Sequence, residues 1–169
     1  MACGKSGNII LIGMPSSGKS TVGVILAKTL GKAFIDTDLL IQQREGKTLQ
    51  EIINEKGNDY FHRVEEAVLL GVEAENTVIA TGGSAVYFPD ALEKFKKSGT
   101  VVYLDITLES VLERLRNIKT RGVTLEKGQT LEDLYNARTP LYESRCDVRV
   151  KADGGTVEDV IERIIEALS

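Results

Sequence analysis

The chain has 169 residues, of which 42% are hydrophobic and 27% are charged, and its net charge is -4. This composition is that of an ordinary globular protein and excludes a disordered or fibrous chain, and the length favours one domain, residues 1–169, with a genuine core. The acidic balance argues against a partner that is nucleic acid or an anionic membrane, but it is compatible with a local basic site for phosphates.

Strand and helix patterns alternate along the chain, which is typical of an α/β fold with a mainly parallel sheet covered by helices on both faces. Apolar runs without polar alternation predict buried strands at Asn8–Ile12, Ala33–Ile35, Thr77–Ala80, Thr100–Leu104 and Asp147–Val150. Helical spacing predicts helices at Lys19–Leu30, Leu49–Glu55, Phe61–Glu73, Asp90–Lys97, Leu108–Arg116, Leu131–Tyr142 and Val157–Leu168. Thr107 and Thr130 stand where helices begin, and Gly31 and Gly57 stand where helices end.

Residues 13–20, GMPSSGKS, join the first predicted strand to the first predicted helix. Glycines let such a loop turn tightly and bring its backbone N–H groups against phosphate oxygens, and the helix N-terminus faces the same anion. Lys19 would contact the β- and γ-phosphates, and the Ser20 hydroxyl would bind Mg²⁺. The residues expected to hold ATP here are Gly13, Pro15, Ser16, Ser17, Gly18, Lys19, Ser20 and Thr21.

An acidic pair, Asp36 and Asp38, follows the second predicted strand. Ligands of open α/β sheets bind at the carboxyl ends of the strands, which is also where the phosphate loop is expected. Alternation along an extended segment would point both carboxylates the same way, where they suit a water-bound Mg²⁺ and a hydroxyl-bearing substrate. The other interpretation is an N-cap for a helix that starts near Leu39.

The segment Asn117–Gln129 is polar, contains two glycines and is long for a connection inside a compact domain. Because it carries Arg121 between two predicted helices, we interpret it as a mobile lid over the phosphate site. The alternative is an ordinary surface loop.

The two cysteines, Cys3 and Cys146, are far apart and match neither a disulfide framework nor a metal-ligand spacing. No apolar run approaches the roughly 18–20 residues that span a bilayer, and the first residues lack the apolar region of a secretion signal. We therefore expect a cytoplasmic protein.

Taken in order, GMPSSGKST, FIDTD, FHRVEEAVL, VIATGGSAV and ARTPLYE resemble the successive motifs of shikimate kinases over essentially the whole chain. The resemblance implies a P-loop fold related to nucleoside monophosphate kinases, with strand order 2-3-1-4-5 and substrate-binding helices at about residues 37–74. It also implies transfer of the γ-phosphoryl of ATP to the 3-hydroxyl of shikimate. The partner would be this small molecule, and we expect a monomer.

The resemblance also implies roles for single residues. Asp38 would bind the substrate hydroxyls and serve as the base, and Asp36 would hold Mg²⁺ through water. Lys19, Asp38 and Arg121 would be catalytic, and Arg121 would also bind ATP as the lid arginine that closes over the transferring phosphoryl group. Arg114 would stack on adenine, a role that suits a planar guanidinium. The substrate-binding residues would be Asp38, His62, Gly82, Gly83, Ser84 and Arg138.

Simpler interpretations exist for some of these residues. The two glycines could form only a tight turn, Arg138 could be a solvated charge on a helix, and Arg114 could pair with Glu109 or Glu113.

The sequence departs from the family pattern in the acceptor site. His62 stands where the family has an arginine for the substrate carboxylate, and a neutral imidazole lacks the charged fork of arginine. Carboxylate affinity should then be lower or pH-dependent, unless Arg63 compensates. Ser84 replaces a third glycine, Gly122 a lid proline, and Thr156 a proline at the adenine site.

Two alternatives follow from these departures. One is a kinase for another small polyhydroxylated acceptor. The other is a nucleotide-binding protein without catalysis, which the retention of Lys19, Ser20, Asp36, Asp38 and Arg121 argues against.

Overall fold

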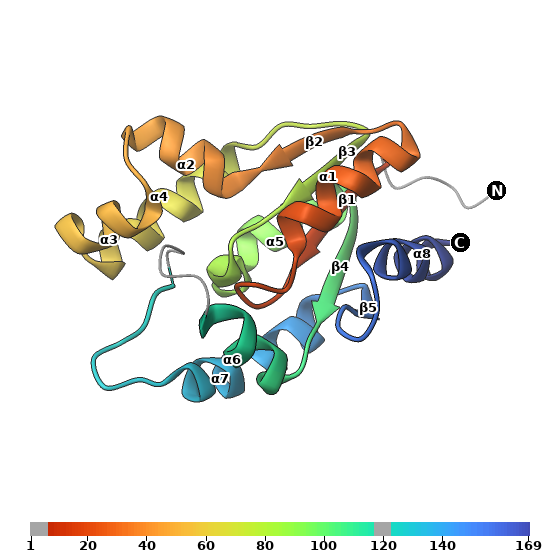
Figure 1. The fold of residues 1–169 in the computed structure, drawn as a ribbon. Coiled ribbons are helices and arrows are strands. Elements are labelled where there is room, and N and C mark those ends of the chain that lie inside the picture. Colours follow the sequence, from red (N-terminus) through yellow and green to blue (C-terminus); the bar gives the residue numbers. More distant parts are fainter. Residues whose placement is uncertain (1–6, 117–122) are drawn as a thin grey trace.

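The computed structural model of the protein describes residues 7–116 and 123–169. Its centre is one sheet of parallel strands in the order β2-β3-β1-β4-β5 (Figure 1). The strands are β1 (Asn8–Ile12), β2 (Ala33–Asp36), β3 (Thr77–Ala80), β4 (Gly99–Asp105) and β5 (Val148–Lys151). The expected fold class and strand order are thus confirmed, with strand ends that differ by one residue in β2, β4 and β5.

The helices also lie close to their predicted positions. They are α1 (Lys19–Leu30), α2 (Thr37–Glu45), α3 (Leu49–Lys56), α4 (Asn58–Gly71), α5 (Pro89–Ser98), α6 (Leu108–Arg116), α7 (Leu131–Arg145) and α8 (Val157–Leu168), with a 3-10 helix η1 (Gly83–Tyr87). Gly31 ends α1 in the left-handed conformation, and Thr130 caps α7. The sequence patterns did not predict η1.

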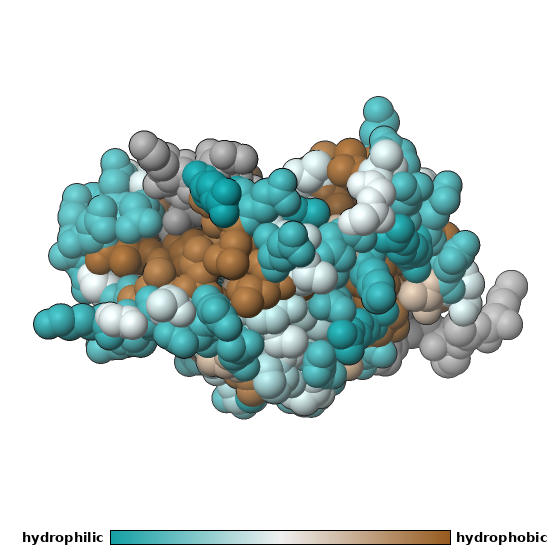
Figure 2. Space-filling view, turned by 60° about the horizontal axis from the view of Figure 1, so that its bottom comes forward, coloured by the Kyte–Doolittle hydropathy of each residue, from teal (hydrophilic) through white to brown (hydrophobic). Residues whose placement is uncertain are grey.

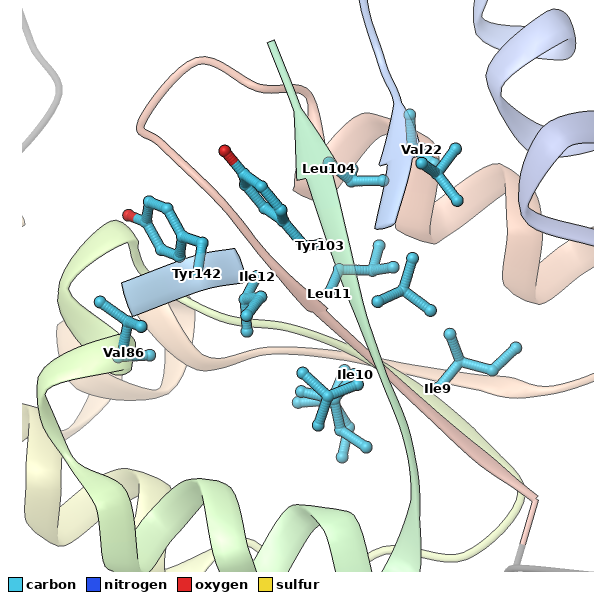
Figure 3. Packing of buried hydrophobic residues seen from close by; sticks show 14 of the residues in the cluster. Ile9, Ile10, Leu11, Ile12, Val22, Val86, Tyr103, Leu104 and Tyr142 are labelled. Carbon is cyan, nitrogen blue, oxygen red and sulfur yellow. The ribbon is translucent and has the colours of Figure 1, made fainter. Parts of the chain in front are cut away.

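The central strand is buried along its whole length because helices cover both faces of the sheet. Ile9 and Leu11 point toward α1 together with Leu104, whereas Ile10 and Ile12 point to the opposite face with Tyr103 (Figure 3). The ring of Tyr103 stacks on Tyr142 of α7 at a centroid distance of 5.2 Å. A continuous apolar run is required here because the alternation of a strand sends its side chains to both cores.

A second, smaller cluster lies among α2, α3 and α4, which form a separate group of helices beside the sheet (Figure 1). It contains Ile41, Ile52, Phe61 and Val64. This cluster packs the expected substrate-binding helices against one another.

The lower face of the molecule carries α6 and α7, and Figure 2 shows hydrophobic residues in a hollow bordered by hydrophilic ones on this face. Across residues 7–116 and 123–169, no helix is long and apolar enough to cross a membrane.

Candidate active site

The phosphate loop connects β1 to α1, as the sequence predicts. Gly18 adopts φ 94°, the left-handed region that favours glycine, and caps the helix start. At Gly13, with φ 150°, a Cβ would lie 2.7 Å from the Leu104 carbonyl oxygen. These two positions therefore need glycine for different reasons, one for backbone conformation and one mainly for space.

Lys19 is buried, and its ammonium donates to the carbonyl oxygens of Gly13 and Met14, each at 2.8 Å. It also lies 3.3 Å from Ser17 Oγ. The loop thus holds its own lysine at the place where phosphate oxygens would bind.

Arg114 reaches the other side of the loop from α6. Its Nη1 donates to the Ser16 carbonyl oxygen at 2.9 Å, and its Nη2 approaches the Ala152 carbonyl oxygen at 3.5 Å. Neither Glu109 nor Glu113 forms an ion pair with it in the described part of the chain. The guanidinium is therefore fixed beside the phosphate loop rather than on the helix surface.

The two aspartates differ in how they reach the site. Asp36 ends β2 and caps α2, because its Oδ1 accepts from the backbone N–H groups of Asp38 and Leu39 at 2.9 and 3.4 Å. Its Oδ2 accepts from Ser20 Oγ at 2.7 Å. Asp36 is thus both a cap and a partner of the phosphate loop.

The expectation of an extended segment through Asp38 is wrong, because the helix begins at Thr37. Asp38 points instead from the first turn of α2 toward Gly82, where a Cβ would lie 2.8 Å from its Oδ1. The capping bonds of Asp36 cause this early helix start.

The oxygen donors at Ser20 and Asp36 suit Mg²⁺, which prefers hard oxygen ligands and keeps several waters. In the two described ranges, no group of three or more His, Cys, Asp or Glu could enclose a metal ion. This donor set fits an ion shared with nucleotide phosphates rather than one caged by protein.

Two adjoining cavities lie between the phosphate loop and α2. The larger, of about 280 Å³, is lined by loop residues and by Asp38, Thr81 and Gly83. The smaller cavity extends from there to α4 and α7. Its lining residues are Pro15, Asp38, Phe61, Glu65, Gly82, Gly83, Ser84, Thr124 and Arg138. Because Asp38 and Gly83 line both, a group in the small cavity can meet a phosphate on the loop.

Arg138 is 2% exposed and lies in the wall of the small cavity. Its Nη2 donates to Thr124 Oγ1 at 3.1 Å, and its guanidinium lies 5.4 Å from the centre of the Tyr87 ring. Among the described residues its Nε has no hydrogen-bond partner, and no carboxylate forms an ion pair with it. The interpretation of a solvated helix charge is therefore wrong. A buried cation in this state fits an anionic ligand.

Glu65 is a residue of this cavity that the sequence analysis missed. It is 1% exposed on α4 and accepts a short hydrogen bond from Ser84 Oγ. The pKa of Glu65 is raised to about 7, because burial and the charge of Asp38 raise it by more than the Ser84 hydrogen bond and the charges of Arg138 and Lys19 lower it. The sequence feature that could have indicated its burial is its position one turn after Phe61 and one turn before Leu69, in the apolar stripe of the helix.

Gly82 and Gly83 bring backbone close to these charged side chains. A Cβ on Gly82 would lie 2.6 Å from Glu65 Oε2, and one on Gly83 would lie 2.9 Å from Arg138 Nη1. The glycine pair is thus required by crowding at the cavity and is more than a tight turn.

His62 lies next to the cavity but is not among its lining residues. Its Nε2 is 3.3 Å from Thr124 Oγ1, and its ring packs edge-on against Phe88. The neighbouring Arg63 is exposed. Burial and the charge of Arg138 lower the pKa of His62, whereas Asp59 and Glu126 raise it.

Arg121 and Gly122, together with residues 117–120 of the expected lid, lie outside the described residues. Residues 123–129 form an irregular segment before α7, in which Thr124 is buried. Asn58 donates to the Leu125 carbonyl oxygen at 3.1 Å and joins this segment to α4. Thr124 is a second cavity residue that the sequence analysis missed.

Thr156 belongs to a capping box at the start of α8, where its hydroxyl accepts from the Asp159 backbone N–H. The structure therefore gives this residue a stabilising role independent of any nucleotide.

Comparisons with known proteins agree with this geometry. The sequence model of the family described as shikimate kinase matches residues 15–169. A shikimate kinase of Persephonella marina is 35% identical over 161 residues, which make up 94% of this chain and 96% of that protein. A shikimate kinase of Aquifex aeolicus is 38% identical, and the match covers 95% of each chain.

Solved structures give the same result. Shikimate kinase from Acinetobacter baumannii in complex with shikimate has a TM-score of 0.88 at 33% identity, over 96% of this chain and 92% of that one. The Aquifex aeolicus structure has a TM-score of 0.82, over 95% of both chains. A gluconokinase from Sinorhizobium meliloti, 18% identical with a TM-score of 0.61, shares the fold alone. With the motifs in order, the matching strand order and relatives along nearly its whole length, this chain belongs to the shikimate kinase family.

Proposed function

We infer that the protein transfers the γ-phosphoryl group of ATP to the 3-hydroxyl of shikimate. The observation that carries this inference is the buried guanidinium of Arg138, which lacks a carboxylate partner among the described residues and borders a cavity that opens toward the phosphate loop. An acceptor with a carboxylate at one end and hydroxyls at the other fits this arrangement, and shikimate is such a molecule.

The nucleotide site is built from the loop at residues 13–20, Thr21 and Arg114. The backbone N–H groups of Ser16, Ser17 and Gly18, which follow Pro15 in the loop, would bind phosphate oxygens at the start of α1. Lys19 would exchange its contacts with the Gly13 and Met14 carbonyl oxygens for β- and γ-phosphate oxygens. Arg114 would cover the adenine from the edge of the loop.

Ser20 and Asp36 would hold Mg²⁺, Ser20 directly and Asp36 through water. The ion supplies positive charge that offsets the charge of the phosphates during transfer. The protein's own part is to keep these two oxygen atoms together, which the strand-end cap at Asp36 does.

The acceptor side orients one hydroxyl toward the γ-phosphate. Asp38 would accept the hydroxyl proton as the new O–P bond forms, while the bond from the γ-phosphorus to the β-phosphate oxygen breaks and ADP leaves. Arg138 would bind the carboxylate, and Gly82, Gly83 and Ser84 would lie against the ring. His62 belongs to this side of the site, and Arg121 would act on the transferring group as part of a lid at residues 117–129.

A kinase for a different polyhydroxylated acid is the second candidate. It is favoured by one observation: His62 lies outside the cavity lining, and among the described residues Arg138 is the only cationic side chain in that lining. We propose the shikimate reaction over it because the shikimate kinase family model matches residues 15–169 and a shikimate kinase aligns with 94% of the chain. We further propose that the enzyme is a single-domain monomer of the cytoplasm.

The test is ADP release in a coupled assay with ATP, Mg²⁺ and shikimate, repeated with quinate and with shikimate methyl ester between about pH 6 and pH 9. Shikimate should give saturable turnover, and the ester, which lacks the negative charge, should give a KM at least about tenfold higher. Turnover of quinate with none of shikimate would establish the second candidate instead. ATP binding without turnover of any acceptor would contradict both.

A further inference from the structure

The hydroxyl of Thr124 lies between two basic side chains in the wall of the acceptor cavity. Its Oγ1 is 3.1 Å from Arg138 Nη2 and 3.3 Å from His62 Nε2. Thr124 is 6% exposed and belongs to the irregular segment before α7, far in sequence from both partners. A buried hydroxyl that touches two basic groups needs an explanation beyond filling space.

The directions of these hydrogen bonds follow from the chemistry of the three groups. A guanidinium only donates, so Arg138 donates to Oγ1. The single hydroxyl hydrogen of Thr124 can then go to a lone pair on His62 Nε2, or Nε2 can donate its own hydrogen to the second lone pair of Oγ1. The first arrangement requires a neutral His62 with its hydrogen on Nδ1. Burial and Arg138 lower the pKa of His62, and they outweigh Asp59 and Glu126, in keeping with a neutral ring.

This chain of bonds fixes the rotation of the Arg138 guanidinium. Nη2 is occupied by Thr124, Nη1 faces the backbone at Gly83, and the Tyr87 ring packs against the group. Nε has no hydrogen-bond partner among the described residues. Without the Thr124 hydroxyl, Nη2 would lose the hydrogen bond that orients it, and part of the binding free energy of the acceptor would be spent on orienting this end of the guanidinium.

We propose that Thr124 is a positioning residue of the acceptor site, which orients Arg138 toward the acceptor carboxylate, and that His62 acts on the acceptor through Thr124 rather than by contact. This proposal rests on the proposed function in one respect, the carboxylate of the acceptor. The hydrogen-bond chain itself exists without any ligand, so it can be tested separately.

The first test uses the fact that the chain has a single histidine, so its imidazole nitrogens are assigned without ambiguity. Long-range ¹H–¹⁵N correlation spectra of the full-length protein above the pKa of His62 should show hydrogen on Nδ1 and a lone pair on Nε2. Thr124→Val should move the hydrogen population toward Nε2, and Thr124→Ser should keep it on Nδ1. A wild-type ring with hydrogen on Nε2, unchanged in Thr124→Val, would overturn the proposal whether or not the protein phosphorylates shikimate.

The second test is kinetic. Thr124→Val, which keeps the volume and removes the hydroxyl, should raise the KM for shikimate about tenfold, as expected for one hydrogen bond to a charged group, with the KM for ATP within about twofold. Thr124→Ser should restore the KM to within about threefold. The matched control is Thr29→Val, on the exposed side of α1, where the hydroxyl donates only to the Ile25 carbonyl oxygen.

A double-mutant cycle separates action through Thr124 from direct contact by His62. His62→Phe keeps a ring against Phe88, and it should add less than about twofold to the KM effect of Thr124→Val. Full multiplication of the two effects would show that His62 contacts the acceptor itself. Equal KM values for Thr124→Val and wild type, in protein with unchanged circular dichroism, would contradict the positioning role. Absence of any shikimate turnover in wild type would contradict the proposed function, and the spectra would then decide on the hydrogen-bond chain.

Discussion

The nucleotide side and the acceptor side of the site are built in opposite ways. The phosphate loop is one continuous stretch between β1 and α1, and it satisfies the charge of Lys19 with its own carbonyl oxygens. The acceptor cavity takes its wall from α2, α4, η1, α7 and the segment 123–129. There the buried ionisable side chains of Glu65 and Arg138 form no ion pair among the described residues, and Arg138 Nε has no hydrogen-bond partner there.

This difference shows where each site obtains its stability. The nucleotide loop holds its lysine ammonium by local hydrogen bonds, to the carbonyl oxygens of Gly13 and Met14 and to Ser17 Oγ. The acceptor cavity holds groups whose burial costs free energy until an anion and hydroxyls pair with them. Ligand binding should therefore stabilise the acceptor side more than its buried area suggests.

The largest effect is expected on the nucleotide side, from Lys19→Met. The substitution keeps the length of the side chain but removes the charge that stabilises the transferring phosphoryl group, and kcat should fall by about 10²–10³-fold. Steady-state ADP release at saturating ATP and shikimate measures it. Lys28→Met, an exposed lysine in the last turn of the same helix, is the control and should retain wild-type kcat. A loss below about fivefold in Lys19→Met would mean that the loop acts without its lysine.

The next effect concerns the buried carboxyl of the acceptor side. The folded pKa of Glu65, about 7, lies above its ordinary value of 4.5, so the folded protein holds a proton that the unfolded chain releases between these values. Stability from this group is complete below about pH 4.5 and is lost as pH rises through 7. Glu65→Gln should therefore gain roughly 3 kcal/mol of unfolding free energy over wild type near pH 8 and little near pH 4.

Urea unfolding of both proteins across that pH range measures the difference between their unfolding free energies. His62, whose pKa is lowered, contributes with the opposite sign, but it is present in both proteins and its contribution cancels in the difference. Glu66→Gln, at an exposed neighbouring position, is the matched control and should show no such slope. If the unfolding free energies of Glu65→Gln and wild type changed in parallel with pH, the acceptor side would carry no free-energy cost from a buried carboxyl, and this contrast with the nucleotide side would be wrong.

A smaller effect is expected from Gly82→Ala. Gly82 has φ -73°, which alanine adopts freely, so the only obstacle is the methyl group, 2.6 Å from Glu65 Oε2 and 2.8 Å from Asp38 Oδ1. Overpacking of this kind costs about 1–3 kcal/mol, and the KM for shikimate should rise about tenfold or more while the KM for ATP stays within about threefold. Gly71→Ala, where a Cβ meets nothing within 4 Å, is the control. An equal rise in the KM values for shikimate and ATP would show that the substitution affects the nucleotide side as much as the acceptor side.

The smallest effect lies outside both sites. Thr156→Ala removes the side-chain acceptor of the capping box on α8 and should lower the unfolding free energy by about 1 kcal/mol. Thr156→Ser should recover most of it. Thermal unfolding at one fixed protein concentration distinguishes them, and equal midpoints for Thr156→Ala and wild type would contradict the capping role.

The same contrast explains what the sequence could predict. The nucleotide loop depends on consecutive residues, so its glycines, Lys19 and Ser20 could be placed from their spacing between a strand and a helix. Strands such as β1 were predictable because burial on both faces requires an unbroken apolar run. The first residues of α2 and α4, Thr37 and Asn58, were harder to predict. They depend on the cap at Asp36 and on Gly57, which ends α3 and begins α4.

The acceptor side depends on which distant residues meet in space. Glu65 looked like one of several acidic residues on a helix, and only the packing of α4 against η1 shows that it is buried beside Ser84. Thr124 lies in a segment without periodicity, so nothing local indicated its contacts with Arg138 and His62. The resemblance to shikimate kinases supplied the candidates Gly82, Gly83 and Arg138, but not the way in which their surroundings constrain them.

Tyr142 has one further consequence. Its hydroxyl donates to the Gly83 carbonyl oxygen, its ring stacks on Tyr103 of β4, and Arg145 in the next turn of α7 donates to the Val86 carbonyl oxygen. The helix that carries Arg138 is thus fastened to the backbone of η1 and, through Tyr103, to the sheet. The distance between the Arg138 guanidinium and the end of the cavity that faces the phosphate loop is therefore held constant. An acceptor one carbon longer or shorter could not place its carboxylate at Arg138 and its hydroxyl at the phosphate loop at the same time. The protein should therefore select its acceptor by length as well as by charge.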